Sequence, residues 1–106
     1  MNLKGKKFVM VGGAGLIGSH TVDNLIREDV QEILIYDNMV RGRIENLHDA
    51  MKYPRVKIYD IGGDIMQTDI LQSAFEGADG VFHFAALWLL QCHDYPRSAF
   101  DVNVRG

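Results

Sequence analysis

The chain has 106 residues, of which 47 % are hydrophobic and 24 % charged, and its formal net charge is −3. These values fit one globular domain and exclude a disordered, fibrous or membrane-embedded chain. The basic residues are scattered along the sequence, so we expect no nucleic acid and no membrane among the partners.

The N-terminus predicts a cytoplasmic location. It carries no cationic segment followed by an apolar stretch and a cleavage site, and no window has the length of a membrane span. Cys92 is the single cysteine, so it cannot form an internal disulfide. His93 beside it points in another direction on a helix or strand, and we therefore predict no metal site.

Strand and helix patterns alternate along the first half of the chain. The run at 7–11 is apolar on both faces, as in a central parallel strand, and residues 16–28 repeat apolar side chains at helical spacing. A second buried strand is predicted over 32–36 and a short helix over 43–51.

The alternation continues in the second half, with a strand predicted over 55–60, a helix over 67–75 and a strand over 80–84. Another helix is expected to start at Pro96 and to run to the end of the chain. The pattern predicts an α/β fold, a Rossmann-type doubly wound parallel sheet truncated after about four strands. We expect residues 1–106 to form the N-terminal portion of a dinucleotide-binding domain, with the substrate domain absent.

Three closely spaced glycines between the first strand and the first helix carry the strongest chemical signal. Gly13-x-Gly15-x-x-Gly18 and Gly12-x-x-Gly15-x-x-Gly18 both have dinucleotide-loop spacing. Such glycines let the backbone turn sharply, approach a pyrophosphate and open a helix whose positive dipole end faces the anion. Glycine turns also occur for backbone geometry alone, but the position between strand and helix favours a phosphate loop.

Asp37 follows Gly18 by 19 positions, at the end of the second predicted strand. A carboxylate there accepts hydrogen bonds from the adenosine ribose hydroxyls and repels a 2′-phosphate, which favours NAD over NADP. The alternative is a turn residue that ends the strand. Arg41 and Arg43 are either solvated loop charges or ligands for that 2′-phosphate, so the choice of cofactor stays open.

Two further segments follow strand ends. Asp64 is predicted to accept a hydrogen bond from the adenine amino group, with the Ile65 amide on the ring, although a helix-capping role competes. Small residues at 85–87 would let the backbone pass close to the cofactor at the topological switch point. His83 is expected to be a buried, hydrogen-bonded core residue. The apolar run at 88–90 lines a substrate pocket or packs against a partner surface.

Five motifs occur in order along the chain: residues 12–20, residues 37–47, residues 63–65, residues 81–87 and residues 101–106. Together they resemble the NAD-dependent epimerase/dehydratase family, the extended short-chain dehydrogenase/reductases that act on nucleotide sugars. Val11 departs from the family pattern, which usually has threonine there, and this puts one local hydrogen bond in doubt.

The resemblance implies NAD as cofactor and, in the whole enzyme, a nucleotide-sugar substrate and a possible homodimer. It places the pyrophosphate on Gly12, Gly15, Leu16, Ile17 and Gly18. It places the adenosine ribose on Asp37 and Asn38, the adenine on Asp64 and Ile65, and the inner part of the cofactor on Ala85, Ala86 and Leu87.

The family's chemistry also implies a Ser or Thr and a Tyr-x-x-x-Lys pair, whose tyrosine acts as base. Tyr53 with Lys57 is the one formal match; it lies before the third strand and contains Pro54, so we interpret it as coincidence. We therefore predict no catalytic residue and no turnover by these 106 residues, whereas the intact enzyme would transfer a hydride between NAD and a sugar carbon. Two alternatives remain: a non-catalytic dinucleotide-binding module that regulates a partner, or a fragment that pairs through its fourth-strand edge.

Overall fold

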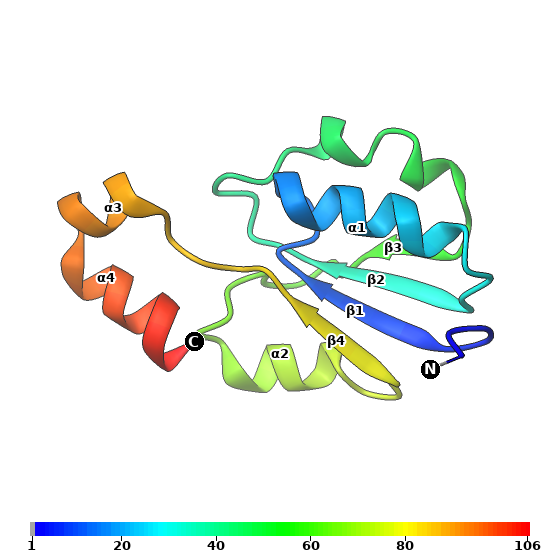
Figure 1. The fold of residues 1–106 in the computed structure, drawn as a ribbon. Helices are drawn as coiled ribbons and strands as arrows, with labels where there is room; N and C mark the ends of the chain where they lie inside the picture. The colour runs from blue at the N-terminus through cyan, green and yellow to red at the C-terminus, as the bar shows by residue number, and fades with distance from the viewer. Residues whose placement is uncertain (1) are drawn as a thin grey trace.

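The structure is a computed structural model that describes residues 2–106. Its centre is a parallel four-stranded sheet with the order β3-β2-β1-β4 (Figure 1). The strands are β1 (Lys7–Val11), β2 (Glu32–Tyr36), β3 (Val56–Ile58) and β4 (Gly80–His83). This order confirms the predicted Rossmann-type α/β fold with four strands.

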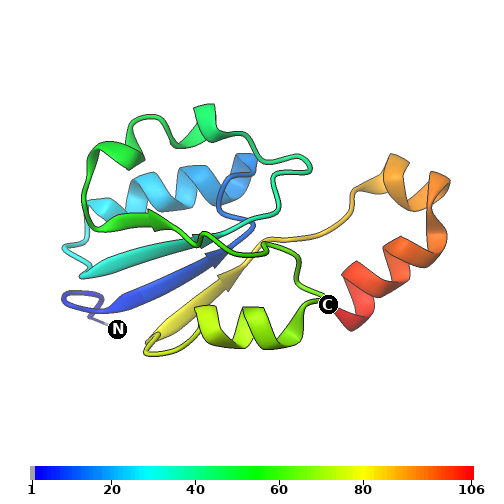
Figure 2. The same cartoon turned by 180° about the vertical axis from the view of Figure 1, so that it is seen from behind.

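Helices cover both faces of the sheet. One face carries α1 (Leu16–Ile26) and the short 3₁₀ turns η1 (Ile44–Leu47) and η2 (Ala50–Lys52). The other face carries α2 (Thr68–Ala74), as the view from behind shows (Figure 2). The site described below lies where the loops from both layers meet.

β1 is central because its side chains are apolar in both directions. It pairs with β2 on one side and β4 on the other, with Val9 opposite Leu34 and Val81. Phe8 and Met10 belong to the core beneath α1, and the alternate residues of the strand belong to the core beneath α2. Two buried faces are what a central parallel strand requires.

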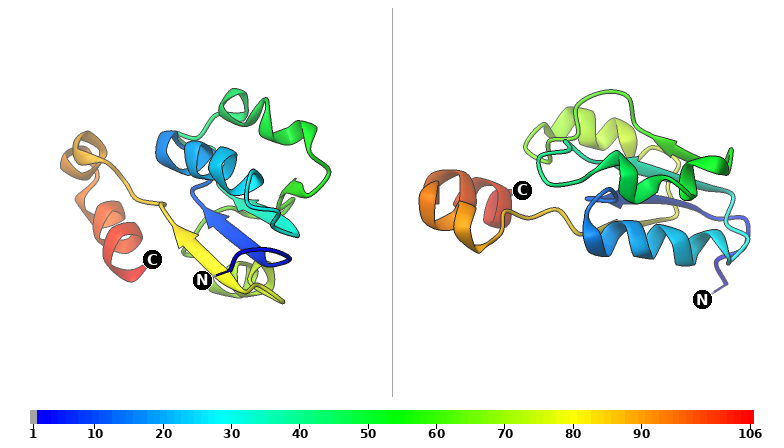
Figure 3. Two further views of the ribbon diagram at one scale, coloured as in Figure 1. Left: turned by 45° about the vertical axis from the view of Figure 1, so that its right-hand side comes forward. Right: turned by 90° about the horizontal axis from the view of Figure 1, so that it is seen from above.

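The last part of the chain forms an arm that extends away from the sheet (Figure 3). It contains α3 (Leu89–Asp94), α4 (Pro96–Phe100) and the π-helical turn η3 (Asp101–Arg105). The side-chain amide of Asn103 anchors it, accepting from Leu87 N at 2.7 Å and donating to Leu87 O at 2.9 Å. No helix within residues 2–106 combines the length and the apolar character needed to cross a membrane.

Four differences from the predicted elements stand out. The helix over 43–51 is instead two 3₁₀ turns, η1 and η2, which bury Leu47 and Ala50 respectively. The first helix ends at Ile26 rather than at 28, and Asp29 then takes a left-handed conformation (φ 55°) that reverses the chain. The third strand is shorter than 55–60.

The fourth difference is α3, which no sequence pattern indicated. Its N-cap residue, Trp88, makes no capping hydrogen bond through its side chain, and Leu89 is 80 % exposed. A helix with neither a capping residue nor a buried apolar face leaves no periodic signal.

Candidate functional site

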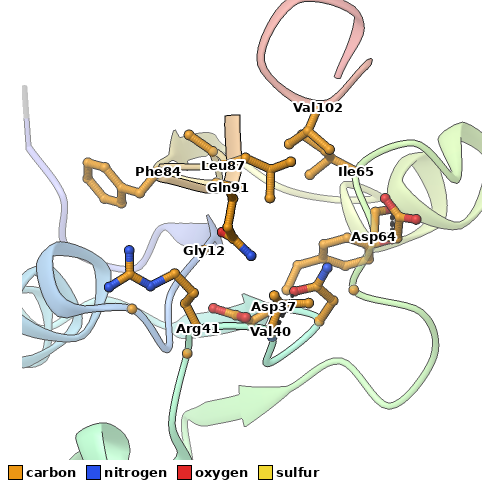
Figure 4. A pocket seen from close by; sticks show the side chains of 17 residues that line it. Gly12, Asp37, Val40, Arg41, Asp64, Ile65, Phe84, Leu87, Gln91 and Val102 are labelled. Carbon is orange, nitrogen blue, oxygen red and sulfur yellow. Dashed lines mark hydrogen bonds between the residues drawn. The ribbon is translucent and has the colours of Figure 1, made fainter. Parts of the chain in front are cut away.

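A pocket lies at the carboxyl ends of β1, β2 and β4, where loops from both layers converge (Figure 4). This is the edge at which open parallel sheets bind ligands. It brings together nine of the predicted site residues: Gly12, Gly15, Asp37, Asn38, Asp64, Ile65, Ala85, Ala86 and Leu87. Leu16, Ile17 and Gly18 do not line it; they form the first turn of α1 beside it.

The glycine loop is packed so closely at Gly12 and Gly18 that side chains do not fit at these two positions. Gly12 has φ +82°, and a Cβ there would lie 2.8 Å from the backbone nitrogen of Ala85. Ala85 is the first small residue after β4. A Cβ on Gly18 would overlap the Gly12 carbonyl oxygen and lie 2.8 Å from Gly13 Cα. The loop therefore holds the start of α1 tightly against the end of β1, as a phosphate loop requires.

The first turn of α1 presents unpaired donors. Gly15 is its N-cap and has no side chain to bond them, and the first bond of the helix runs from Ser19 N to Gly15 O at 2.9 Å. The N–H groups of residues 16–18 precede that bond and have no carbonyl partner within the helix. These donors and the positive end of the helix dipole fit a pyrophosphate next to Gly15. Leu16, Ile17 and Gly18 would then act through their backbone.

The Asp37 carboxylate has a structural role as well as a place in the pocket. Its Oδ2 accepts from Ala14 N at 2.9 Å, and its Oδ1 accepts from Met39 N at 2.8 Å. Gly42 packs on the same carboxylate. The turn-residue interpretation thus has support, yet each oxygen keeps a second lone pair for a ribose hydroxyl.

Asp64 does not cap the following helix. Its Oδ1 accepts from Met66 N at 2.9 Å, and the N-cap of α2 is Gln67, without a side-chain bond. The Asp64 carbonyl accepts from the hydroxyl of Tyr36 at 2.9 Å. Tyr36 is fully buried, and this burial raises the pKa of its hydroxyl. The hydrogen bond joins the end of β2 to the loop after β3, on the side of the pocket predicted to take the adenine.

Gln91 and Val102 are among the lining residues that the sequence analysis did not predict. Gln91 of α3 points into the pocket (Figure 4). Its side-chain oxygen is buried and has no hydrogen-bond partner within residues 2–106. Val102 reaches the same pocket from η3. No signal in the sequence could have placed Gln91 there, because α3 itself was not predicted.

Asn46 lies outside the pocket but shapes it. Its side-chain Nδ2 donates to Ala14 O at 2.9 Å, and Arg43 N donates to the same carbonyl at 3.1 Å. The start of η1 is thereby tied to the glycine loop. Asn46 belongs to the motif at residues 37–47, but the motif itself does not indicate this hydrogen bond.

The two arginines after β2, Arg41 and Arg43, differ in whether they line the pocket. Arg41 lines the pocket, with its guanidinium carbon 4.1 Å from the centre of the Trp88 ring. Arg43 does not line it. Trp88 contacts Arg41 from the connection between β4 and α3 without lining the pocket itself, while Leu89 and Leu90 are exposed.

The remaining candidates lie elsewhere. His83 was expected to be buried, but it is exposed because β4 is an edge strand and a polar side chain at the edge reaches water. Tyr53 and Lys57 do not reach the pocket, and Lys57 Nζ pairs with Glu32 Oε2 at the opposite end of the sheet, 3.7 Å away. The structure thus places this pair away from the pocket. Residues 2–106 contain no cluster of three or more potential metal ligands.

Comparison with protein families gives a match over residues 9–106 to a family described as the 3-beta hydroxysteroid dehydrogenase/isomerase family. The chain is 35 % identical over 102 residues to the UDP-glucose 4-epimerase of Streptococcus mutans, which covers 92 % of this chain and 28 % of that protein. A UDP-glucose 4-epimerase of Rickettsia bellii is 32 % identical over 106 residues, 30 % of its length. The chain thus spans less than a third of these relatives.

Two solved structures also match nearly the whole of this chain with about a third of their own length. Bordetella bronchiseptica WbmF in complex with NAD+ superposes with a TM-score of 0.82 at 26 % identity, over 97 % of this chain and 30 % of that one. DesIV of Streptomyces venezuelae, a dTDP-glucose 4,6-dehydratase with NAD and TYD bound, has a TM-score of 0.84 at 27 % identity, over 93 % and 32 %.

Proposed function

Because the chain belongs to the NAD-dependent epimerase/dehydratase family of extended short-chain dehydrogenase/reductases, we propose that residues 1–106 form its NAD-binding portion. The observation that carries the proposal is one pocket that combines a glycine loop and two carboxylates with the free N–H groups at the start of α1 beside it. These are the groups that a dinucleotide needs for its pyrophosphate, ribose and adenine.

Each part of the pocket has its own task in this proposal. The backbone N–H groups at the start of α1 bind the pyrophosphate, and Gly15 leaves room for it. The carboxylate of Asp37 accepts from the ribose hydroxyls, and Asp64 with Ile65 borders the adenine. The small residues after β4, Ala85 and Ala86, let the inner half of the dinucleotide lie against the backbone. When bound, NAD supplies the hydride acceptor.

For the whole protein we propose a nucleotide sugar as substrate. The relatives at 32–35 % identity named above are UDP-glucose 4-epimerases, and DesIV acts on dTDP-glucose. The matched family is described by a steroid reaction. No residue of the pocket distinguishes the two substrate classes, so the sugar assignment depends on these relatives. We propose that residues 1–106 alone give no turnover, since Tyr53 and Lys57 are remote from the pocket.

Calorimetric titration of the chain with NAD and NADP tests the proposal. We expect NAD to bind more tightly, because a 2′-phosphate would approach the carboxylate of Asp37. Asp37→Asn should weaken NAD binding about tenfold, as expected for one charge-assisted hydrogen bond, and reduce the preference for NAD. Asp23→Asn on α1 removes the same charge outside the pocket and should change neither value.

A folded chain that binds neither dinucleotide would refute the proposed function. Incubation with NAD and UDP-glucose tests the absence of turnover. Formation of an epimerised sugar would show that the chain has a catalytic group that we have not identified.

A further inference from the structure

Arg41 is the one cationic side chain that lines the pocket in the described part of the chain. Two carboxylates, Asp37 and Asp64, line the same pocket, so its side chains carry more negative than positive charge. A dinucleotide adds two further negative charges through its pyrophosphate. Arg41 is therefore the one lining side chain whose charge attracts that pyrophosphate.

The loop that carries Arg41 is attached to the glycine loop. Arg43 N donates to Ala14 O at 3.1 Å, and Gly42 packs so closely on Ala14 that an added Cβ would lie 2.8 Å from the Ala14 Cβ. Figure 4 shows the guanidinium on the Gly12 side of the pocket, away from Asp64. This is the side on which the first turn of α1 presents its N–H groups.

The Trp88 ring holds Arg41 in this place. The guanidinium carbon lies 4.1 Å from the ring centre, a stacking distance for a cation on an aromatic face. No hydrogen bond or ion pair occupies the Arg41 guanidinium within residues 2–106. A stacked guanidinium keeps its N–H donors in the plane and free for a planar, bidentate partner such as a phosphate.

From these contacts we propose that Arg41 binds the pyrophosphate of the dinucleotide and that Trp88 is its positioning residue. The inference rests on the proposed function and adds a side-chain ligand to the backbone donors. A 2′-phosphate is the weaker candidate, because it would have to lie beside the carboxylate of Asp37. The pyrophosphate lies at the start of α1, where the loop of Arg41 is attached.

Trp88 is the single tryptophan of the chain, so its fluorescence reports ligand binding at this contact directly. The ligands are adenosine, ADP, NAD and NADP. Arg41→Gln should weaken ADP, NAD and NADP by the same factor, about tenfold for one charge-assisted contact, and leave adenosine unchanged. The salt dependence of ADP binding should also decrease. Arg43→Gln, two residues away and outside the pocket, should change none of these values.

Calorimetry tests the role of Trp88. Trp88→Leu should weaken ADP binding when Arg41 is present and cause no further loss in the Arg41→Gln background. Independent, additive losses would show that the ring contributes by itself and would overturn its positioning role.

The outcomes separate the two proposals. If the wild-type chain binds NAD and ADP and Arg41→Gln binds them equally well, Arg41 is not a ligand and the proposed function stands. A loss confined to NADP would assign Arg41 to the 2′-phosphate and overturn the pyrophosphate assignment. A folded wild-type chain that binds neither NAD nor ADP would overturn both proposals.

Discussion

Replacing Gly18 by alanine tests the packing of the glycine loop directly. Gly18 lies in the first turn of α1, and its Cβ would overlap the carbonyl oxygen of Gly12. The second neighbour, Gly13 Cα, would be 2.8 Å away. Both contacts are to backbone, so no flexible side chain can rotate to make room. The start of α1 must move away from β1 if the methyl group is to fit.

The expected cost is the difference between two opposing effects. Overpacking a tight site costs about 1–3 kcal/mol, and we take the upper end, about 3 kcal/mol, because both neighbours are backbone atoms. Alanine in a helix regains about 0.5–1 kcal/mol relative to glycine. The free energy of unfolding should therefore fall by about 2 kcal/mol, which for a domain of this size lowers the melting temperature by roughly 8–16 °C.

Gly15→Ala is the matched control. A Cβ there would lie 3.4 Å from Gly12 O, an ordinary contact, and the backbone of Gly15 (φ −74°, ψ 178°) suits alanine. Its free energy of unfolding should change by less than about 1 kcal/mol. Gly15 lines the pocket, however, so this variant should bind NAD more weakly while remaining stable.

Urea unfolding followed by far-ultraviolet circular dichroism measures both variants. A Gly18→Ala chain as stable as wild type would refute the argument, because it would mean that α1 does not need this close approach to β1. Destabilisation by Gly15→Ala equal to that by Gly18→Ala would refute it too, since the two contacts differ so much.

Three further predictions concern side chains that join segments distant in sequence. Asn46→Ala removes the hydrogen bond to Ala14 O, and urea unfolding should show a loss of about 1 kcal/mol; an unchanged midpoint would mean that the bond contributes nothing. Asn103→Ala frees the arm from Leu87, so the Leu87 amide should exchange hydrogen faster, and equal protection would contradict the anchoring role. Burial raises the pKa of Tyr36, so its protonated form is favoured by folding, and this stabilisation is complete below about pH 10 and lost as the pH rises through the folded-state pKa. Urea unfolding between pH 8 and 11 should therefore show a steeper loss for wild type than for Tyr36→Phe, and parallel curves would refute the effect.

The sequence alone determined the elements that depend on local patterns. The bounds of β1 and β2 are those predicted, because a short apolar run between turn residues specifies a buried strand without outside help. The glycine spacing likewise indicated the tight turn before α1, since only glycine fits such close backbone contacts. Nine of the predicted site residues follow strand ends, and they meet in one pocket because the carboxyl ends of parallel strands lie at one edge of the sheet.

The tertiary structure alone decided features that depend on contacts between distant segments. The stacking of Arg41 on Trp88 joins the loop after β2 to the connection after β4, and neither residue carries a local sign of the other. Gln91 reaches the pocket from a helix that has no periodic apolar face. The exposure of His83 follows from the position of β4 at the edge of the described sheet. The direction of a side chain depends on which segment packs beside it, and local sequence patterns do not contain that information.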